Sequence, residues 1–376
     1  MKVVIALDSF KGSLSSAAAG EACREGLLRA LPETDAHVFP IADGGEGTMD
    51  VFLGLGMVRR EATVTGPLGG KMTAGYCAGD GRAFIEMAVC AGLPLVPPEK
   101  RNPLNTTTRG VGELILAALD DGAREIYLGI GGSATSDCGL GMLSALGYGF
   151  FDEDGVPCGD RGRDVANVAR IDLSGADRRL SACRFVVACD VTNPLFGPNG
   201  AAHIFAPQKG ASPEDVEFLD TAAKKFAALS SEHNAGLPGA GAAGGLGFAL
   251  KEFLEAALVP GIDFVLDAVG LEGEIRDAEL VITGEGRLDG QSVMGKAPSG
   301  VARRAKKYGV PVLALAGSIG SGAEASNKAG IDAYFSIVPG PCTLSEAMDV
   351  ETARKNLART AEQAFRLFFV GRKHPE

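Results

Sequence analysis

Short apolar runs recur along both ends of the chain, and each is followed by a turn rich in glycine and polar residues. Residues 3–7 form the first run, which is continuous and rich in β-branched side chains, so it predicts a buried parallel strand. Residues 15–31 then predict a helix that begins at Ser15 or Ser16 and ends before Pro32. A strand, a turn and a helix in this order are typical of an α/β fold.

The same alternation continues through most of the chain. Further strands are predicted at residues 37–41, 126–130, 185–188, 280–283, 310–315 and 333–337. Further helices are predicted after Pro213, over 344–369 as one helix or a helix pair, and at residues 49–55, 111–119, 140–146, 248–257 and 298–307.

Residues 61–86 break this pattern. Apolar and polar side chains alternate there between glycine-containing turns, which predicts antiparallel strands. We therefore expect two α/β domains. One is a doubly wound, Rossmann-like parallel sheet built from both chain ends, residues 1–62 and 265–376. The other is an inserted domain with a mixed sheet, residues 63–264.

Composition fits a globular protein and restricts its partners. Of the 376 residues, 46% are hydrophobic and 22% are charged, so the chain can bury a core. The net charge of -11 argues against a nucleic acid or a membrane surface as the partner. An anionic ligand would therefore depend on local cations, helix ends or backbone N–H groups.

Cysteine usage indicates the cytoplasm. The eight cysteines contain no C-x-x-C pair, and we expect reduced thiols in a cytoplasmic protein. The four histidines have no metal-ligand spacing. The first apolar run is too short for the core of a signal peptide, and no segment has the length of a membrane span.

The segment LGIGGSATSDCGLG, residues 128–141, is the central candidate for an anion site. It leaves a predicted strand, turns at Gly131 and Gly132, offers hydroxyls at Ser133 and Thr135, and enters a predicted helix. Glycine lets backbone N–H groups approach a phosphate, and a helix N-terminus adds partial positive charge. The segment matches neither common phosphate-loop pattern, so a tight turn that needs glycine only for its dihedral angles is an equal alternative.

Acids, hydroxyls and a cation also follow the first predicted strand, at Asp8, Ser9, Lys11 and Ser13. Asp8 would lie at the carboxyl end of that strand, where open α/β sheets bind ligands. The alternative is that Asp8 caps a turn and that Lys11 is a solvated charge.

Two carboxylates, Asp43 and Glu46, flank glycines in the segment ADGGEGT after the second predicted strand. They suit a magnesium-linked site or a hydroxyl-binding site. Glu46 could instead be a first-turn carboxylate favoured by the helix dipole.

Later strand ends carry similar residues. Asp190 follows residues 185–188 and could be a catalytic base, a magnesium ligand or an Asx-turn residue before an Asn-Pro pair. Glu285, Arg287 and Asp289 follow the strand predicted at 280–283.

The glycine-rich residues 236–247 lack a convincing preceding strand, so a dinucleotide loop fails its context test and a flexible hinge between domains is as good an interpretation.

Parallel strands bring their carboxyl ends to one edge of a sheet, so we expect these turns to converge. Acids, hydroxyls and a few cations around glycine-lined anion-binding turns suit Mg²⁺-assisted phosphoryl transfer. No histidine lies in any of the turns, which disfavours Ser–His–Asp and hydride-relay chemistry.

The same segments resemble the bacterial type I glycerate kinase family, in the family's order, over residues 1–367. The similar motifs are VIALDSFKGSLSS, PIADGGEGT, VTGPLG, NPLNTTTRGVGELI, LGIGGSATSDCGLGM, ACDVTNPLFGPNGAA, PQKGA, GAGAAGGLG, PGIDFVLDAVGL and ITGEGRLDGQSVMGKAP. The resemblance implies an ATP- and Mg²⁺-dependent kinase of D-glycerate with two α/β domains and an active site in the cleft between them. It also implies 2-phosphoglycerate as the main product.

Residue roles are hypotheses from chemistry, placed on these motif positions. Lys11 and Arg287 are candidates to bind the substrate carboxylate, and Asp190 to act as the base for the reacting hydroxyl. The remaining candidates are Asp8, Ser9, Ser13 and Asp289 for substrate, Asp43, Glu46 and Glu285 for Mg²⁺, and Gly131, Gly132, Ser133 and Thr135 for the ATP phosphates.

Several alternatives stay open. The product could be 3-phosphoglycerate, and a phosphatase or mutase of small phosphorylated acids would use the same anion-binding turns without ATP. A metabolite-sensing regulator is disfavoured by the negative charge. We expect a monomer or a homodimer, with no nucleic acid and no membrane as partner.

Overall fold

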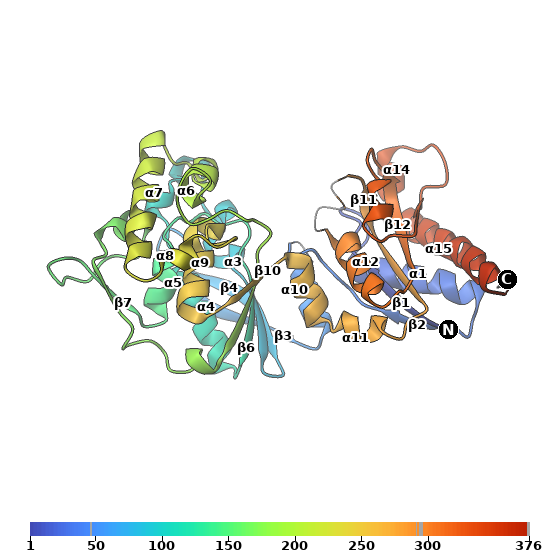
Figure 1. The fold of residues 1–376 in the computed structure, drawn as a ribbon, viewed down its shortest axis with the longest axis horizontal. Coiled ribbons are helices and arrows are strands. Elements are labelled where there is room, and N and C mark those ends of the chain that lie inside the picture. Colours follow the sequence, from blue (N-terminus) through green and yellow to red (C-terminus); the bar gives the residue numbers. More distant parts are fainter. Residues whose placement is uncertain (46, 291, 293–295, 374–376) are drawn as a thin grey trace. The chain divides into compact units, whose positions relative to one another are not determined.

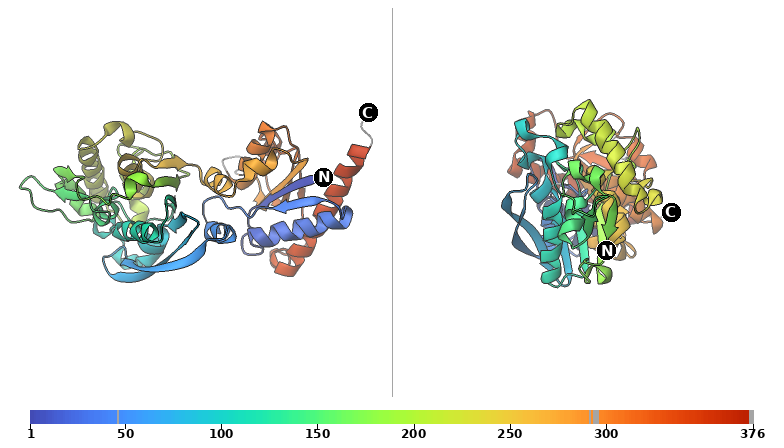
Figure 2. Two further views of the ribbon diagram at one scale, coloured as in Figure 1. Left: turned by 90° about the horizontal axis from the view of Figure 1, so that it is seen from below. Right: turned by 90° about the vertical axis from the view of Figure 1, so that its left-hand side faces the viewer.

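The computed structural model describes residues 1–45, 47–290, 292 and 296–373, with side chains as far as residue 370. The chain divides into two compact units (Figures 1 and 2). The first unit joins Met1–Leu55 to Ile262–Glu376, and the second is Gly56–Gly261. The predicted domain boundaries, after residues 62 and 264, lie a few residues further along the chain than the boundaries of these units.

A parallel sheet forms the centre of the first unit. Among the described residues of this unit it has five strands, in the order β13-β12-β11-β1-β2 (Figure 1). Counted along the unit, this is the flavodoxin-like order 2-1-3-4-5. The strands are β1 (Lys2–Leu7), β2 (Asp35–Val38), β11 (Leu280–Leu288), β12 (Val312–Ile319) and β13 (Ala333–Ser336).

Helices cover both faces of this sheet, as the doubly wound prediction requires. Helices α1 (Ser16–Ala30) and α15 (Val350–Lys373) pack with Ile5 and Leu7 in one apolar cluster. Helix α12 (Ala297–Lys307) packs on β11 outside that cluster. The α/β prediction for the two chain ends is therefore confirmed.

The start of α1 follows from its sequence. Ser15 is the N-cap, and its hydroxyl accepts a hydrogen bond from the N–H of Ala18 at 3.2 Å. Small residues then line the side of the helix that packs on α15, and a Cβ at Gly26 would lie 2.1 Å from the carbonyl oxygen of Ala358. The two helix backbones therefore approach more closely there than any larger residue permits.

The second unit, which is described throughout, holds a six-stranded mixed sheet in the order β10-β9-β6-β5-β4-β3. Strands β3, β4 and β5 are antiparallel, which confirms the prediction for residues 61–86, and the other pairs are parallel. The strands are β3 (Val58–Thr65), β4 (Lys71–Gly79), β5 (Arg82–Glu86), β6 (Glu125–Gly129), β9 (Arg184–Ala188) and β10 (Ala257–Val259). A separate two-stranded sheet, β7 (Gly149–Phe151) with β8 (Arg170–Asp172), was not predicted.

Long helices complete the core of the second unit. Helix α7 (Pro213–Ala228) begins with a capping box between Ser212 and Asp215, and it brings Phe226 against Phe248. The other helices of four or more residues in this unit are α3 (Ala88–Ala91), α4 (Arg109–Asp120), α5 (Leu140–Ala145), α6 (Ala201–Phe205), α8 (Glu232–Ala235) and α9 (Ala242–Leu254).

Shorter helices complete the first unit. They are α2 (Thr48–Gly54), α10 (Gly261–Ala268), α11 (Leu271–Ile275), α13 (Ala325–Lys328) and α14 (Leu344–Met348). Helices α14 and α15 form the pair that the C-terminal pattern allowed. Within the described residues, no helix combines the length and apolar character that a membrane span requires.

Two predictions along the chain are corrected. The helix expected at residues 248–257 lies within α9, whose backbone is non-helical at Ala243, Gly244 and Gly245, so its start is close to the prediction, whereas Ala257 already belongs to β10. The glycine-rich residues 236–247 are not a hinge between domains, because they lie inside the second unit. Gly244 packs there against the backbone of Thr135, where a Cβ would lie 2.1 Å from the carbonyl oxygen.

Gly26→Ala should lower the free energy of unfolding by about 1–3 kcal/mol, because the added methyl group overpacks the contact with Ala358. Urea unfolding followed by circular dichroism measures this change. Gly54→Ala is the matched control, since a Cβ at Gly54 meets nothing within 4 Å, and it should leave stability unchanged or raise it by up to about 1 kcal/mol. Equal stability of the two variants would contradict the close helix contact.

Candidate functional site

A pocket of about 900 Å³ lies at the carboxyl ends of the parallel strands in the first unit. Asp8 and Ser9 enter it directly after β1, Glu285 projects from β11, and Ser318 from β12. The segment after β13 and helix α14 line its other end. Ligands of open α/β sheets bind at this edge, next to the point where the strand order reverses.

Asp8 is a buried acid at the polar end of this pocket. Its carboxylate accepts a hydrogen bond from the N–H of Ser9 at 2.6 Å, and only 7% of the residue is exposed. Burial raises the pKa of Asp8 to about 7, and the negative charges of Asp43 and Glu285 also raise it. Lys11 opposes this shift. Asp8 therefore exchanges a proton near neutral pH unless a cation binds beside it.

Glu285 is a second buried acid of the pocket. Its oxygen Oε1 is buried and has no hydrogen-bond partner among the described residues. The Nζ of Lys296 forms an ion pair with the other oxygen, Oε2, at 3.9 Å. Burial raises the pKa of Glu285, against the lowering by Ser292 and Lys296. A buried carboxylate oxygen without a partner is costly, so it favours a ligand that supplies positive charge.

These acids fit a Mg²⁺ ion that is completed by a phosphate ligand. Among the described residues, no three side chains of His, Cys, Asp or Glu are grouped closely enough to hold a metal ion. Mg²⁺ commonly takes one or two carboxylates together with phosphate oxygens and water, so Asp43 and Glu285 suffice for that arrangement. Glu46, the third predicted ligand, lies outside the described residues.

The other predicted residues of the first unit differ in their placement. Ser9, Lys11 and Ser13 line the pocket, and the buried hydroxyl of Ser13 has no hydrogen-bond partner among the described residues. Arg287 lines the pocket, whereas Asp289 does not and forms an ion pair with Arg287 at 3.1 Å. Both Glu285 and Arg287 lie within β11 and not after it, because that strand stays paired with β12 as far as Leu288.

In the second unit, the predicted anion turn is only partly as expected. Gly131 and Gly132 follow β6 and are exposed, and Gly132 has a φ of 71°, which favours glycine. Ser133 and Thr135 are buried. The hydroxyls of Thr135 and Ser136 are buried and have no hydrogen-bond partner within the part of the chain that the structure describes.

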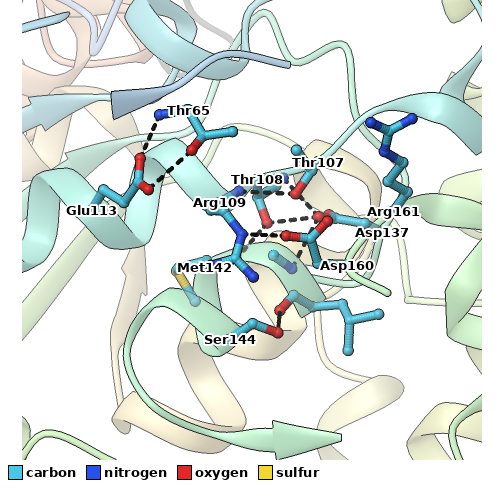
Figure 3. Close-up of polar contacts among 12 residues, drawn as sticks. Thr65, Thr107, Thr108, Arg109, Glu113, Asp137, Met142, Ser144, Asp160 and Arg161 are labelled. Atoms are coloured by element: carbon cyan, nitrogen blue, oxygen red, sulfur yellow. Dashed lines mark hydrogen bonds and ion pairs between the residues drawn. The ribbon is translucent and has the colours of Figure 1, made fainter. Parts of the chain in front are cut away.

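The N-terminus of helix α5 was expected to attract a phosphate, but its N–H groups donate hydrogen bonds to the carboxylate of Asp137. Helix α5 is short, and Asp137 accepts hydrogen bonds from the N–H groups of Gly139 and Gly141 at 3.2 and 3.3 Å. Thr108 donates two more, from its N–H at 2.7 Å and its hydroxyl at 2.8 Å (Figure 3). Burial raises the pKa of Asp137 to about 6 although these bonds lower it. Asp137 thus serves to hold the turn, and sequence reasoning did not assign it a role.

Lys209 is the residue that sequence reasoning missed. It comes from the motif PQKGA, and its side chain is almost fully buried, with 2% exposed. Its Nζ donates hydrogen bonds to Ser133 Oγ at 2.8 Å and to the carbonyl oxygen of Thr135 at 2.6 Å. Burial lowers the pKa of Lys209 to about 7, while Asp137 raises it. The turn therefore has its own cation.

Asp190 follows β9 and is exposed. Its Oδ1 accepts a hydrogen bond from the N–H of Gly261 at 2.8 Å, which ties the end of β9 to the segment after β10. This contact agrees with a turn-holding role. Its role as a base stays a prediction.

The structure thus gathers most candidates of the first unit around one pocket: Asp8, Ser9, Lys11, Ser13, Asp43, Glu285 and Arg287. The candidates of the second unit are Gly131, Gly132, Ser133, Thr135 and Asp190. That all of these residues serve one site stays a prediction.

Comparison with known proteins gives a consistent result along the whole chain. The model of the glycerate kinase family matches residues 3–369. A protein named glycerate kinase from Bacillus subtilis (strain 168) is 50% identical over 368 residues, which are 96% of either chain. A protein named glycerate 2-kinase from Escherichia coli (strain K12) is 48% identical over 372 residues, 96% of this chain and 98% of that protein.

A solved structure is similar over its full length. A crystal structure from Salmonella typhimurium LT2, provisionally described as a glycerate kinase 2, has a TM-score of 0.89 and 45% identity, with 100% of both chains covered. The α/β fold described above is therefore shared with that protein.

Asp8→Asn should change how stability depends on pH. Burial raises the pKa of Asp8 from its ordinary value of 3.8 to about 7, so the folded protein binds an extra proton between these pH values, and the contribution of Asp8 to stability falls as pH rises through them. Urea unfolding in EDTA should show the variant gaining stability relative to wild type from pH 4 to pH 7.

The control is Asp349→Asn, where hydrogen bonding to Thr352 lowers the pKa of the aspartate. Its stability difference from wild type should stay constant from about pH 5 to pH 7, since that carboxyl titrates below this range. The same constancy for Asp8→Asn would contradict the buried, proton-binding environment described for Asp8.

Lys209→Met should lower kcat/KM at least tenfold, because Ser133 Oγ and the Thr135 carbonyl lose a charged donor worth about 1.5–3 kcal/mol. Steady-state kinetics measures the loss, with thermal unfolding as a check of folding. Lys225→Met is the matched control: Lys225 is exposed, and its Nζ donates a hydrogen bond to the Ala166 carbonyl at 3.1 Å. A Lys209→Met enzyme with wild-type kinetics would show that the turn works without this cation.

Proposed function

Because the chain belongs to the glycerate kinase family, we propose that it transfers the γ-phosphoryl group of ATP to the 2-hydroxyl group of D-glycerate, giving 2-phospho-D-glycerate and ADP. The family itself makes the chain a kinase. The observation that carries the choice of product is the 48% identity, over nearly the full length, with a protein named glycerate 2-kinase.

Phosphoryl transfer needs mainly positioning and charge stabilisation, and the pocket of the first unit offers residues for both. We assign Asp43 and Glu285, together with Glu46, to Mg²⁺. The ion would neutralise charge on the phosphates. The Oε1 of Glu285, which has no hydrogen-bond partner among the residues described, and the raised pKa of Asp8 support a cation at this end of the pocket.

D-Glycerate is an anion with two hydroxyl groups, so it needs a cation and hydrogen-bonding groups. Lys11 and Arg287 are assigned to its carboxylate. Asp8, Ser9 and Ser13 are assigned to its hydroxyls, and Asp289 orients Arg287 through their ion pair. The buried, unpartnered hydroxyl of Ser13 supports a polar ligand there.

The glycine turn of the second unit is assigned to the ATP phosphates. Gly131 and Gly132 would offer backbone N–H groups, and Ser133 and Thr135 would offer hydroxyls. Lys209 adds positive charge beneath the turn, where its Nζ reaches Ser133 Oγ. Lys209 would therefore supply the positive charge that was expected from the N-terminus of α5, whose N–H groups donate to Asp137.

Asp190 is assigned as the base that accepts the proton of the reacting hydroxyl. Its exposure makes it accessible to a substrate, and the bond from Gly261 holds one carboxylate oxygen in place. We also propose that the enzyme acts in the cytoplasm as a monomer or a homodimer. Its eight cysteines are unpaired in the described part of the chain, which suits a reducing compartment.

Phosphorus NMR of a mixture of protein, ATP, Mg²⁺ and D-glycerate tests the reaction and its position. The expected result is ADP with a phosphomonoester at the 2-position, and no product when ATP is left out. A 3-phosphate product would overturn the proposed position. Release of inorganic phosphate from phosphoglycerates without ATP would indicate a phosphatase instead.

Asp190→Asn tests the proposed base. The amide oxygen can still accept the bond from Gly261, so the fold should persist while kcat falls by about 10²–10⁴-fold. Asp154→Asn, the same change at an exposed turn residue of the second unit, should leave kcat within twofold. A fall of less than about tenfold for Asp190→Asn would remove Asp190 from the role of base.

A further inference from the structure

The pocket of the first unit is much larger than D-glycerate requires. Its volume of about 900 Å³ lies in the range of sites for drug-sized molecules and cofactors. D-Glycerate is a three-carbon acid whose surface is almost entirely polar, so it would fill only the end near Asp8 and Glu285. The rest of the pocket has room for a second chemical group.

That remaining space has apolar walls. Ile319 ends β12, Val338 follows β13, and Leu344 and Met348 project from α14. Leu344 is 75% exposed and Met348 is 36% exposed, although both are large apolar side chains. Exposed apolar side chains that gather around a hollow mark a ligand site, whereas a phosphate or carboxylate gains nothing from them.

The apolar wall is formed by a locally stabilised helix. A capping box fixes the start of α14: the N–H of Thr343 donates to Glu346 at 2.8 Å, and the N–H of Glu346 donates to the hydroxyl of Thr343 at 3.3 Å. The capping box therefore fixes the start of the helix that carries Leu344 and Met348.

The pocket thus has two chemically different ends along one sheet edge. Acids and a cation, Asp8, Asp43, Glu285 and Lys296, lie at the end near β1 and β11, where the strand order reverses. The apolar end lies beyond β12 and β13. A ligand that matches both ends has an apolar group and an anionic group that a cation links to carboxylates. A magnesium-bound nucleotide has this composition, and the switch point of such sheets is a nucleotide site in general.

We propose that the apolar end of this pocket binds the purine base of the nucleotide, with Val338, Leu344 and Met348 against the ring. The inference rests on the proposed function only in taking ATP as the phosphate donor. It adds a site for the base of that nucleotide, formed by residues of the first unit alone.

Protection of Cys342 tests the base site without any need for catalysis. Cys342 is exposed and lines the pocket next to Leu344. Adenosine should slow its alkylation by N-ethylmaleimide at least fivefold, measured by peptide mass spectrometry, whereas inorganic tripolyphosphate and D-glycerate should not. Cys342→Ser identifies the labelled position. Protection by tripolyphosphate without protection by adenosine would overturn the proposal.

Leu344→Asp and Met348→Asp test the same site through kinetics. Each should raise the KM for ATP at least tenfold and leave the KM for D-glycerate within twofold. Val350→Asp is the matched control: Val350 is 52% exposed at the start of α15 and is absent from the described lining of the pocket. An unchanged KM for ATP, or a rise in the KM for D-glycerate alone, would overturn the base site.

The two proposals fail separately. Protection of Cys342 by adenosine in a protein that does not phosphorylate D-glycerate would support the base site and refute the proposed reaction. Phosphorylation of D-glycerate without protection by adenosine, and with unchanged kinetics of both aspartate variants, would refute the base site and leave the reaction standing.

Discussion

The pairing of β1 with β11 is the constraint on which the first unit depends. Val3 lies opposite Leu280 and Leu7 opposite Gly284, so the two ends of the chain share one sheet. This register places Asp8 beside Glu285 at the same strand ends, and the N–H of Asp8 continues the ladder by donating to the Gly284 carbonyl at 2.9 Å. Glycine is required there, since a Cβ at position 284 would lie 1.9 Å from the carbonyl oxygen of Leu315.

Two buried carboxylates of the molecule differ in how fully hydrogen bonds satisfy them. Asp137 is buried, but four hydrogen bonds satisfy its carboxylate, and it holds local structure. Glu285 is also buried, yet one of its oxygens has no hydrogen-bond partner in the described part of the chain. The number of satisfied acceptors, and not burial alone, separates a structural carboxylate from one that awaits a ligand.

Much of the fold could be predicted from the sequence, because its signals are local. Continuous apolar runs identified the buried parallel strands, and alternation identified the antiparallel strands β3 to β5. Ser212 and Pro213 marked the start of α7. The pair β7 and β8 has three residues in each strand, too few for a periodic pattern to appear.

The site was less predictable, because its decisive features are non-local. Lys209 reaches Ser133 across 76 positions of sequence, and nothing near Lys209 indicates that its side chain is buried. Asp137 stands inside the central segment, but its bonds to Thr108 cannot be inferred from spacing. The apolar end of the pocket combines β12, β13 and α14, whose apolar residues resemble ordinary core positions when each is considered alone.

The shared sheet has a consequence for synthesis on the ribosome. The second unit is one continuous stretch, Gly56–Gly261, so it can fold as soon as it leaves the exit tunnel. Strand β1 is made well before its partner β11, which begins only at Leu280. The nascent segment that holds β1 must therefore wait, with one strand edge unpaired, until β11 has been synthesised.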